Sequence, residues 1–277
     1  ALSFSSNLNG TTAGAESLNL QTGTGNITFN GLVGNVVPLN VISLDSAGTI
    51  TINQPVTSNS ILTGSGGTTV IDTANVTTVG TQTFNNAVLI KRNTVFSTTN
   101  SNITFNGTIN SYDSSSARTV GMDAGTATVA INGAVGGSNV LGSTSITANT
   151  VSIGASGSIA MGANALSITT DALDIGANLS GTSTLTIAPK TASTTIGLGT
   201  GATGTLQLSD TELGKLADGF SSITFGSSSA TGKITAAAYT YSDNIKLLNY
   251  GSSSGGIEFT GAFSVGSNNL TLYTTGT

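Results

Sequence analysis

The chain has 277 residues, of which only 7% are charged, and its net charge at neutral pH is −5. Its seven Lys and Arg residues are scattered along the sequence and form no basic run of the kind that binds nucleic acid or an anionic membrane surface, so neither partner is expected. The sequence contains no Cys and no His, which excludes disulfides, thiol catalysis and thiolate metal sites.

Gly, Ser, Thr and Asn together make up about half of the chain, a bias that in charged sequences often indicates disorder. Here, however, 37% of the residues are hydrophobic, and they recur at short intervals along the whole chain. This pattern favours many short strands joined by turns of small residues. No run of about 18 apolar residues occurs, so the sequence predicts no membrane-inserted helix.

The hexamer NITFNG occurs twice, at residues 26–31 and 102–107. In the first copy, apolar residues stand at Ile27, Phe29, Val33 and Leu39. The same spacing recurs without gaps at residues 50–62, 129–141 and 173–185, and with altered loop lengths at residues 103–109 and 257–270. The hexamer is therefore the best-preserved copy of a degenerate repeat.

The first apolar residues of the six copies are 27, 50, 103, 129, 173 and 257, which are separated by 23, 53, 26, 44 and 84 residues. These intervals are interpreted as one, two, one, two and four units, or ten units of about 23 residues. A period of this length is typical of solenoids, in which each unit buries its apolar face only by stacking on its neighbours.

Within each copy the apolar residues alternate with polar ones, which predicts strands with one face directed inward. We expect one buried core that contains Ile27, Phe29, Val33, Ile50, Ile52, Val56, Val129, Ile131, Val135, Leu173, Ile175 and Leu179. The nearest approach to a helical pattern is DTELGKLADGF at residues 210–220, where a short helical turn is expected. The sequence thus predicts an all-β, parallel β-solenoid of about 12 coils.

Three stretches, VTTVGTQTFNNAVLI (76–90), SNITFNGTI (101–109) and LGKLADGFSSITFG (213–226), resemble the repeat region of filamentous haemagglutinin-type adhesins and related β-strand-repeat bacterial surface proteins. The resemblance covers most of the chain. It implies a right-handed parallel β-helix that is secreted and displayed at the cell surface. On this interpretation residues 1–277 form a single β-solenoid domain, either a segment of a longer chain or one subunit of a polymer.

Right-handed β-helices also include carbohydrate-active enzymes, and glycoside hydrolysis needs two carboxylates at a set separation. The closest acidic groups in the sequence are Asp171 with Asp174, and Asp210 with Glu212 and Asp218. We interpret these as solvated carboxylates in turns and expect no catalytic, cofactor-binding or metal-binding residue, and hence no enzyme. A polysaccharide lyase or hydrolase remains the alternative, and it would show a lateral groove lined by clustered carboxylates and aromatic rings.

Both ends of the sequence keep the strand pattern. Leu2 and Phe4 alternate at the start, and Leu270 and Leu272 alternate near the end, without an amphipathic helix or a charged block that would cap a terminal coil. We therefore expect head-to-tail self-association, as in a structural protein of a secreted extracellular filament or adhesin. Host or matrix glycans are the further partners that this interpretation suggests.

Overall fold

The computed structural model describes residues 1–250 and 256–274, which hold 31 short strands and one short helix. The strands stack in parallel into a β-solenoid of about 12 turns, about 22 residues apart, which confirms the predicted fold and repeat length. The chain divides into two compact units, residues 1–143 and 144–277, which are described separately. That all 277 residues form a single domain stays a prediction.

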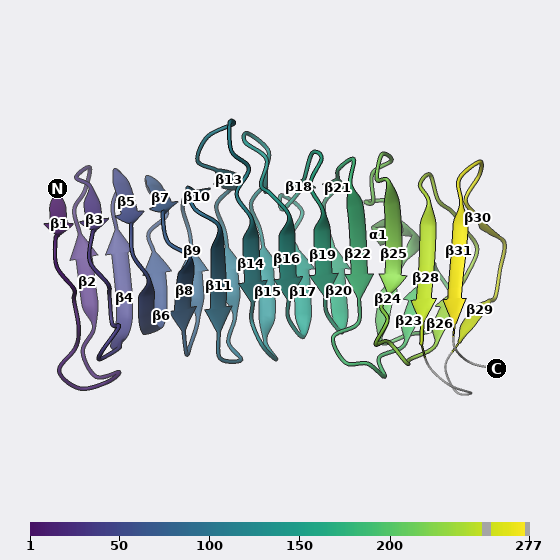
Figure 1. Cartoon of the computed structure of the whole chain (residues 1–277), viewed down its shortest axis with the longest axis horizontal. Coiled ribbons are helices and arrows are strands. Elements are labelled where there is room, and N and C mark those ends of the chain that lie inside the picture. Colours follow the sequence, from purple (N-terminus) through teal and green to yellow (C-terminus); the bar gives the residue numbers. More distant parts are fainter. Residues whose placement is uncertain (251–255, 275–277) are drawn as a thin grey trace. The chain divides into compact units, whose positions relative to one another are not determined.

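Each turn passes through up to three short strands, which stack on the strands of the next turn into three faces, called A, B and C in chain order. In residues 1–143, face A consists of β1 (Leu2–Phe4), β3 (Ile27–Phe29), β5 (Thr49–Ile52), β7 (Thr68–Ile71), β10 (Ala87–Ile90) and β13 (Ile109–Ser111). Every pairing in this face is parallel and in register. The strands follow one another along the stack in chain order (Figure 1).

The other two faces of this unit share one long strand, β6 (Val56–Thr63), whose first half lies in face B and whose second half lies in face C. Face B continues through β8 (Asn75–Thr78), β11 (Thr94–Thr98) and β14 (Val120–Asp123). Face C consists of β2 (Leu18–Gln21), β4 (Leu39–Asp45), β6, β9 (Gln82–Phe84), β12 (Ile103–Phe105) and β15 (Thr128–Ile131).

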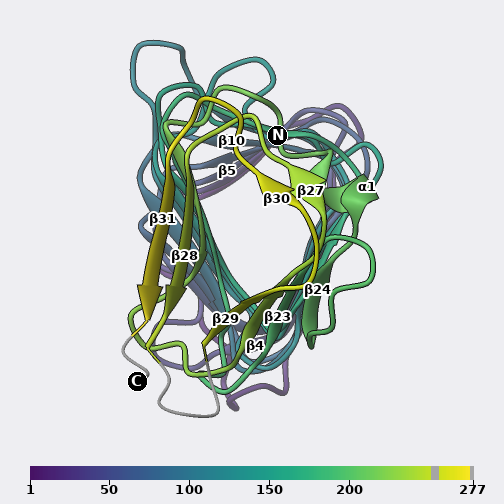
Figure 2. The same ribbon diagram turned by 90° about the vertical axis from the view of Figure 1, so that its right-hand side faces the viewer.

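Residues 144–277 have the same three faces, and their turns are right-handed (Figure 2). This agrees with the right-handed β-helix that the resemblance implied. Face B consists of β16 (Thr144–Thr147), β19 (Leu166–Thr169), β22 (Thr184–Ala188), β25 (Ser222–Gly226), β28 (Ile245–Asn249) and β31 (Leu270–Thr274). Face A holds the pairs β18 (Ile159–Ala160) with β21 (Leu179–Ser180) and β27 (Tyr239–Thr240) with β30 (Phe263–Ser264).

Face C of this unit holds the pair β17 (Thr150–Ile153) and β20 (Ala172–Ile175), and a second sheet in the order β24 (Leu206–Leu208), β23 (Ile196–Leu198), β26 (Ile234–Ala236) and β29 (Ile257–Phe259). The strand order in this sheet is not the chain order, because β24 follows β23 in sequence but lies on its far side from β26.

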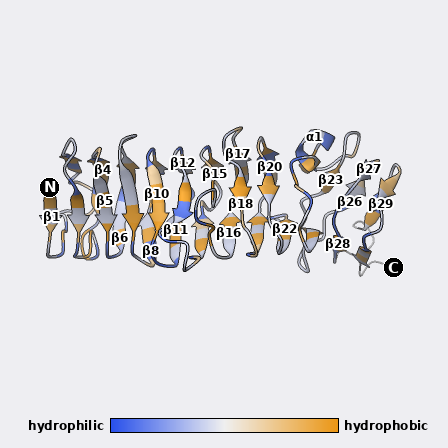
Figure 3. Cartoon of the chain, turned by 90° about the horizontal axis from the view of Figure 1, so that it is seen from above, coloured by the Kyte–Doolittle hydropathy of each residue, from blue (hydrophilic) through white to orange (hydrophobic). Residues whose placement is uncertain are grey.

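The apolar residues gather on the strands, whereas the connecting loops are largely polar (Figure 3). Most of the apolar side chains on the strands are buried. All twelve residues expected in the core are buried, with exposed fractions between 0 and 6%. Along the stack, side chains of the same kind pack on one another in successive turns. The rings of Phe84 and Phe105, for example, stack with their centroids 5.0 Å apart. At about 25 cal/mol for each Å² of apolar surface removed from water, this burial is the main stabilising contribution.

The turn-by-turn alignment inferred from the sequence is wrong in two respects. It placed Ile103 two units after Ile50, in the same column, but Ile50 lies in face A and pairs with Thr69, whereas Ile103 lies in face C and pairs with Gln82. It also equated Leu62 with Leu39, yet Leu62 pairs with Ser43 and is 40% exposed. All three faces use the same alternation, so an apolar pattern identifies a strand without showing to which face it belongs.

The two copies of the hexamer consequently occupy different faces, β3 in face A and β12 in face C, and still play the same local role. In each copy the first Asn accepts a hydrogen bond from a backbone N–H of the next turn, and the second Asn accepts one from an Asn side chain of the next turn. These pairs are Asn26 with Thr49 (2.9 Å), Asn102 with Thr128 (3.1 Å), Asn30 with Asn53 (2.8 Å) and Asn106 with Asn132 (2.8 Å).

The final Gly of the hexamer lies where two turns come closest. A Cβ atom at Gly31 would lie 2.3 Å from the carbonyl carbon of Ser6, and one at Gly107 would lie 2.1 Å from the carbonyl oxygen of Asn86. Both contacts are with backbone, which cannot rotate away. The repeated hexamer is therefore a structural signature of tight stacking between turns.

One turn of residues 144–277 carries an excursion that accounts for the only helix among the described residues. The paired Leu185 and Ile223 are 38 residues apart in sequence (223 − 185), against 19 (185 − 166) for the pair one turn earlier. After β23 the chain reverses through Gly199 and Gly201, both at positive φ, and returns as β24, parallel to β23. The helix α1 (Asp210–Leu213) follows and lies on the outside of the turn (Figure 2).

The short helical turn predicted at residues 210–220 is thus confirmed over its first four residues, with Leu213 and Phe220 buried. A capping box between Ser209 and Glu212 satisfies the free N–H groups at its start. Leu216 then rejoins face A by bridging to Leu179. Among residues 1–250 and 256–274, no helix is long and apolar enough to span a bilayer.

Replacing Gly107 by Ala tests the close approach between turns. The added Cβ would overlap the backbone at Asn86, so the substitution should lower the free energy of unfolding by about 1–3 kcal/mol, the usual cost of overpacking. Gly137→Ala is the matched control, because its Cβ would lie 3.8 Å from the nearest atom, the Cβ of Ala134, and neither glycine has a positive φ. Urea denaturation measures both; equal midpoints for the two variants would contradict the packing described here.

Candidate functional site

The sequence singled out two acidic groups, and the first does not form a pair. Asp171, at the corner before β20, is directed at the loop of the next turn. Its carboxylate accepts hydrogen bonds from the backbone N–H groups of Lys190 (3.0 Å) and Thr191 (2.8 Å), and from the hydroxyls of Thr191 (2.6 Å) and Thr194 (2.8 Å). Asp174 lies on β20 with an exposed side chain and takes no part in this cluster.

These contacts determine the protonation of Asp171. Partial burial disfavours its charged form, but the hydrogen bonds from Thr191, Thr194 and Lys190 outweigh that effect, so the pKa of Asp171 lies below its usual value. A carboxylate held in its charged form by four donors is suited to fixing a loop. It is poorly suited to proton transfer near neutral pH.

The second acidic group does not converge either. Asp210 accepts a hydrogen bond from the N–H of Thr200 (2.7 Å) and so closes the loop between β23 and β24. Glu212 belongs to the capping box of α1 and also accepts a long hydrogen bond from the N–H of Ile175 (3.4 Å). Asp218 is exposed on the turn that follows, and the three carboxylates share no hydrogen-bond partner.

The structure adds an acidic residue that the sequence did not single out. Asp243 is only 5% exposed and accepts a hydrogen bond from the N–H of Gly219 (3.0 Å) in the preceding turn. Burial raises its pKa and the nearby charge of Asp218 raises it further, whereas the hydrogen bond from Gly219 opposes the shift. Asp243 stands in a Ser-Asp-Asn stretch that is typical of turns, so no pattern distinguished it from an ordinary turn residue.

In the described part of the chain, no three Asp, Glu, His or Cys side chains come together as metal ligands would. The acidic side chains that the sequence singled out are spread over β20, the corner before it and the excursion through α1, and those with hydrogen bonds tie one segment of the solenoid to another. The surface feature that departs most from the rest of the fold is apolar and lies at the terminal turns.

The last described turn of residues 144–277 leaves its apolar side chains uncovered. Leu270 and Leu272 of β31 are 38% and 47% exposed, although Ile245 and Leu247, with which they pair in β28, are fully buried. Phe259 of β29 is 40% exposed. These positions continue the core columns, but no further turn among the described residues covers them.

Two neighbouring features add apolar and aromatic surface to this turn. An apolar hollow of about 250 Å³ lies among Phe259, Gly261, Phe263 and Leu270. The rings of Phe259 and Phe263 meet edge to face with their centroids 5.2 Å apart, and Tyr273 stacks on Tyr250 at 4.6 Å. Such rings provide large contact areas that stay ordered when they are exposed.

The first turn of residues 1–143 is uncovered in the same way. Leu2 of β1 is 41% exposed, whereas Ile27, with which it pairs in β3, is fully buried. Phe4 stacks on Phe29 with a centroid distance of 5.0 Å and is partly exposed on its other side. Within the described residues β1 pairs only with β3, and residues 270–273 of β31 pair only with β28, so along both stretches one strand edge has no strand beside it.

A comparison of the chain with protein-family models, with curated proteins and with solved structures finds no significant match. The β-solenoid is therefore established by the structure itself, while the resemblance to haemagglutinin-type adhesins rests on the sequence stretches alone.

Replacing Asp171 by Asn should weaken the attachment of residues 190–194 and lower the free energy of unfolding at pH 7 by about 1 kcal/mol, since the site is partly open to water. Because the folded-state pKa is depressed, the contribution of Asp171 is complete above about pH 4, the unfolded value, and is lost as the pH falls through the lower folded value. Thermal unfolding at pH 7 and pH 2 measures the difference. Asp174→Asn is the control, and a pH-independent deficit for Asp171→Asn would refute this role.

Proposed function

We propose that this chain is a structural protein, a subunit or segment of an extracellular filament or adhesin, whose terminal turns pair end to end with equivalent turns of another copy. The observation that carries the proposal is the sudden exposure of the core columns at β31, β29 and β1. Side chains in the same columns are buried one turn away, and only another turn of the same shape would cover them in the same way.

The open strand edges also determine which turns can pair. An uncovered β-solenoid turn presents unpaired N–H and C=O groups, which another strand readily satisfies. All pairings of these strands inside the chain are parallel, so continuation of the sheets brings the first turn of one copy onto the last turn of another. Such a contact is heterologous and does not close, and it therefore propagates as a filament.

The face order of the two turns is compatible with this junction. The last described turn presents β29 in face C, β30 in face A and β31 in face B. The first turn presents β1 in face A, a bridge at Leu8 in the position of face B, and β2 in face C. Each strand of one turn thus has a counterpart in the other, and β30 would pair with β1.

The secreted, cell-surface location that we propose rests on the resemblance to haemagglutinin-type and β-strand-repeat proteins. The low charge of the terminal strands supports the end-to-end contact. The terminal strands carry a single charged residue, Glu258, which is paired with Lys233, so little electrostatic repulsion opposes stacking of one turn on another.

The test uses single charges placed at each end. Leu272→Glu and Leu2→Glu should each abolish filaments seen by electron microscopy of the purified chain, because a carboxylate would be buried in the junction without a partner. Val95→Glu is the matched control: Val95 is 44% exposed on β11, away from either terminal turn, and filaments should persist.

Mixing the two end variants distinguishes a head-to-tail junction from a head-to-head junction. In a head-to-tail junction each variant keeps one functional end, so each stays monomeric alone and the mixture stops at dimers, as light scattering would show. Dimers of either variant alone would indicate a head-to-head junction instead. A wild-type chain that stays monomeric at every concentration would contradict the proposal and favour turns covered by a covalent continuation of the chain.

A further inference from the structure

The cations of residues 1–143 are scattered in the sequence but gathered in space. This unit contains three Lys and Arg residues, Lys91, Arg92 and Arg118, and all three lie at the corner where the chain passes from face A to face B. Over the whole chain the net charge is −5. A cluster of three cations at one corner therefore contrasts with the negative net charge of the chain.

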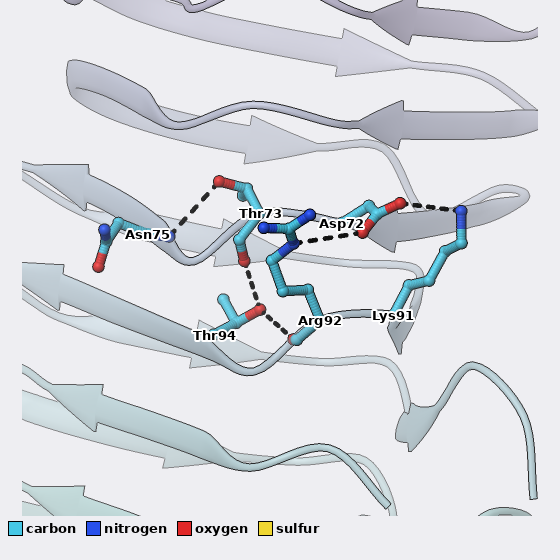
Figure 4. Close-up of polar contacts among 6 residues, drawn as sticks. All are labelled: Asp72, Thr73, Asn75, Lys91, Arg92 and Thr94. Atoms are coloured by element: carbon cyan, nitrogen blue, oxygen red, sulfur yellow. Dashed lines mark hydrogen bonds and ion pairs between the residues drawn. The ribbon is translucent and has the colours of Figure 1, made fainter. Parts of the chain in front are cut away.

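Lys91 is neutralised within the corner. Its ammonium lies 2.8 Å from Asp72 of the preceding turn (Figure 4) and 5.6 Å from the centre of the Tyr112 ring in the following turn. The ion pair with Asp72 raises the pKa of Lys91. Tyr112 is 46% exposed, so the face or edge of its ring that Lys91 leaves uncovered is open to solvent.

Arg92 is held in place but only weakly paired. The hydroxyl of Thr94 donates to the carbonyl oxygens of Thr73 and Arg92, each at 2.7 Å, and so fixes the backbone of the corner (Figure 4). The Nε atom of Arg92 lies 3.6 Å from Asp72, whose other carboxylate oxygen is already bound by Lys91. The side chain is 63% exposed, and its terminal nitrogens point to no acceptor among the described residues.

Arg118 lies on the next turn and lacks an acceptor. It stands two residues before Val120, which pairs with Thr94, just as Arg92 stands two residues before Thr94. The two arginines therefore stand on adjacent turns, whose backbones are about 4.8 Å apart along the stack. The Nε atom of Arg118 is buried without a hydrogen-bond partner in the described part of the chain, which is unfavourable for a charged donor.

The nearby acids offset this positive charge only in part. Asp72 is paired with Lys91, and Asp113 accepts hydrogen bonds from the N–H (3.0 Å) and the hydroxyl (2.6 Å) of Ser115. These hydrogen bonds, and to a lesser extent the charge of Arg118, hold the pKa of Asp113 below its usual value, but no hydrogen bond or ion pair joins the two side chains. Arg92 thus keeps an exposed guanidinium with one long contact to Asp72, and Arg118 stands on the next turn with a buried Nε atom that has no hydrogen-bond partner among the described residues. An external anion that accepts from the terminal nitrogens of both side chains would add a charge partner that the corner lacks.

We propose that this corner binds an acidic saccharide, with the carboxylate of a uronic acid held between Arg92 and Arg118 and the sugar ring packed against Tyr112. A planar carboxylate matches the fork of donors on a guanidinium, and the C–H face of a sugar matches an exposed aromatic ring. The site lies within residues 1–143 and does not depend on end-to-end association.

Calorimetric titration of the full chain with tetragalacturonate at low salt tests the proposal. Binding should weaken as salt rises, because screening reduces the attraction between the guanidinium groups and the carboxylate. Arg92→Gln and Arg118→Gln should each weaken binding about tenfold or more, as loss of a charge-assisted pair does. Tyr112→Ser should weaken it without changing the salt dependence. Circular dichroism checks that each variant keeps the fold.

Lys246→Gln is the matched control, since it removes one exposed cation of residues 144–277 and should leave the affinity unchanged. A neutral galactose tetrasaccharide should not bind. The proposal is overturned by absence of binding, by equal affinity of the wild type and the two Arg variants, or by a tetraglutamate peptide that binds as tightly as tetragalacturonate, which would indicate a general anion-binding surface.

Discussion

Parallel, in-register stacking of one turn on the next is the constraint on which the rest of this structure depends. Because adjacent strands lie about 4.8 Å apart, each side chain meets the side chain at the same position of the next turn. Apolar residues then form continuous columns, as Phe84 and Phe105 do, and Asn side chains form ladders, as Asn106 and Asn132 do. The same spacing requires Gly where backbones crowd, as at Gly107, and makes columns of like charge costly, which explains the low content of charged residues.

The places where the chain departs from this regularity are the ones that invite a functional explanation. The excursion through β24 and α1 adds an extra strand to one face. Its carboxylates have structural roles, since Glu212 caps α1 and Asp210 closes the loop between β23 and β24. The terminal strands β1 and β31 interrupt the columns while their apolar side chains are still exposed. At the corner of Arg92 and Arg118, two like charges stand on neighbouring turns. The first departure is satisfied within the chain. The second leaves apolar side chains exposed, and the third leaves the Nε atom of Arg118 without a hydrogen-bond partner among the described residues.

The sequence alone was sufficient for the fold class, the number of turns and the inward-facing residues, because period-2 alternation and Gly-rich corners are local signals. It did not reveal to which face a strand belongs, since Ile50 and Ile103 carry the same local pattern in different faces. It also missed β24, whose parallel return depends on two glycines at positive φ, and Asp243, whose burial depends on the packing of the turn before it. The cationic corner was invisible in sequence because Arg92 and Arg118 are brought together only by the stacking of two turns.

Cross-linking of cysteine pairs tests the in-register stacking most directly, because the chain contains no Cys of its own. Thr83 and Thr104 pair on adjacent turns of face C, whereas Thr77 lies in face B, where its hydroxyl is 3.2 Å from that of Ser97. With a Cα separation of about 4.8 Å, Thr83→Cys with Thr104→Cys should form a disulfide on mild oxidation. Thr77→Cys with Thr104→Cys should stay reduced. A disulfide in the second pair, with none in the first, would contradict the assignment of strands to faces and the stacking on which it rests.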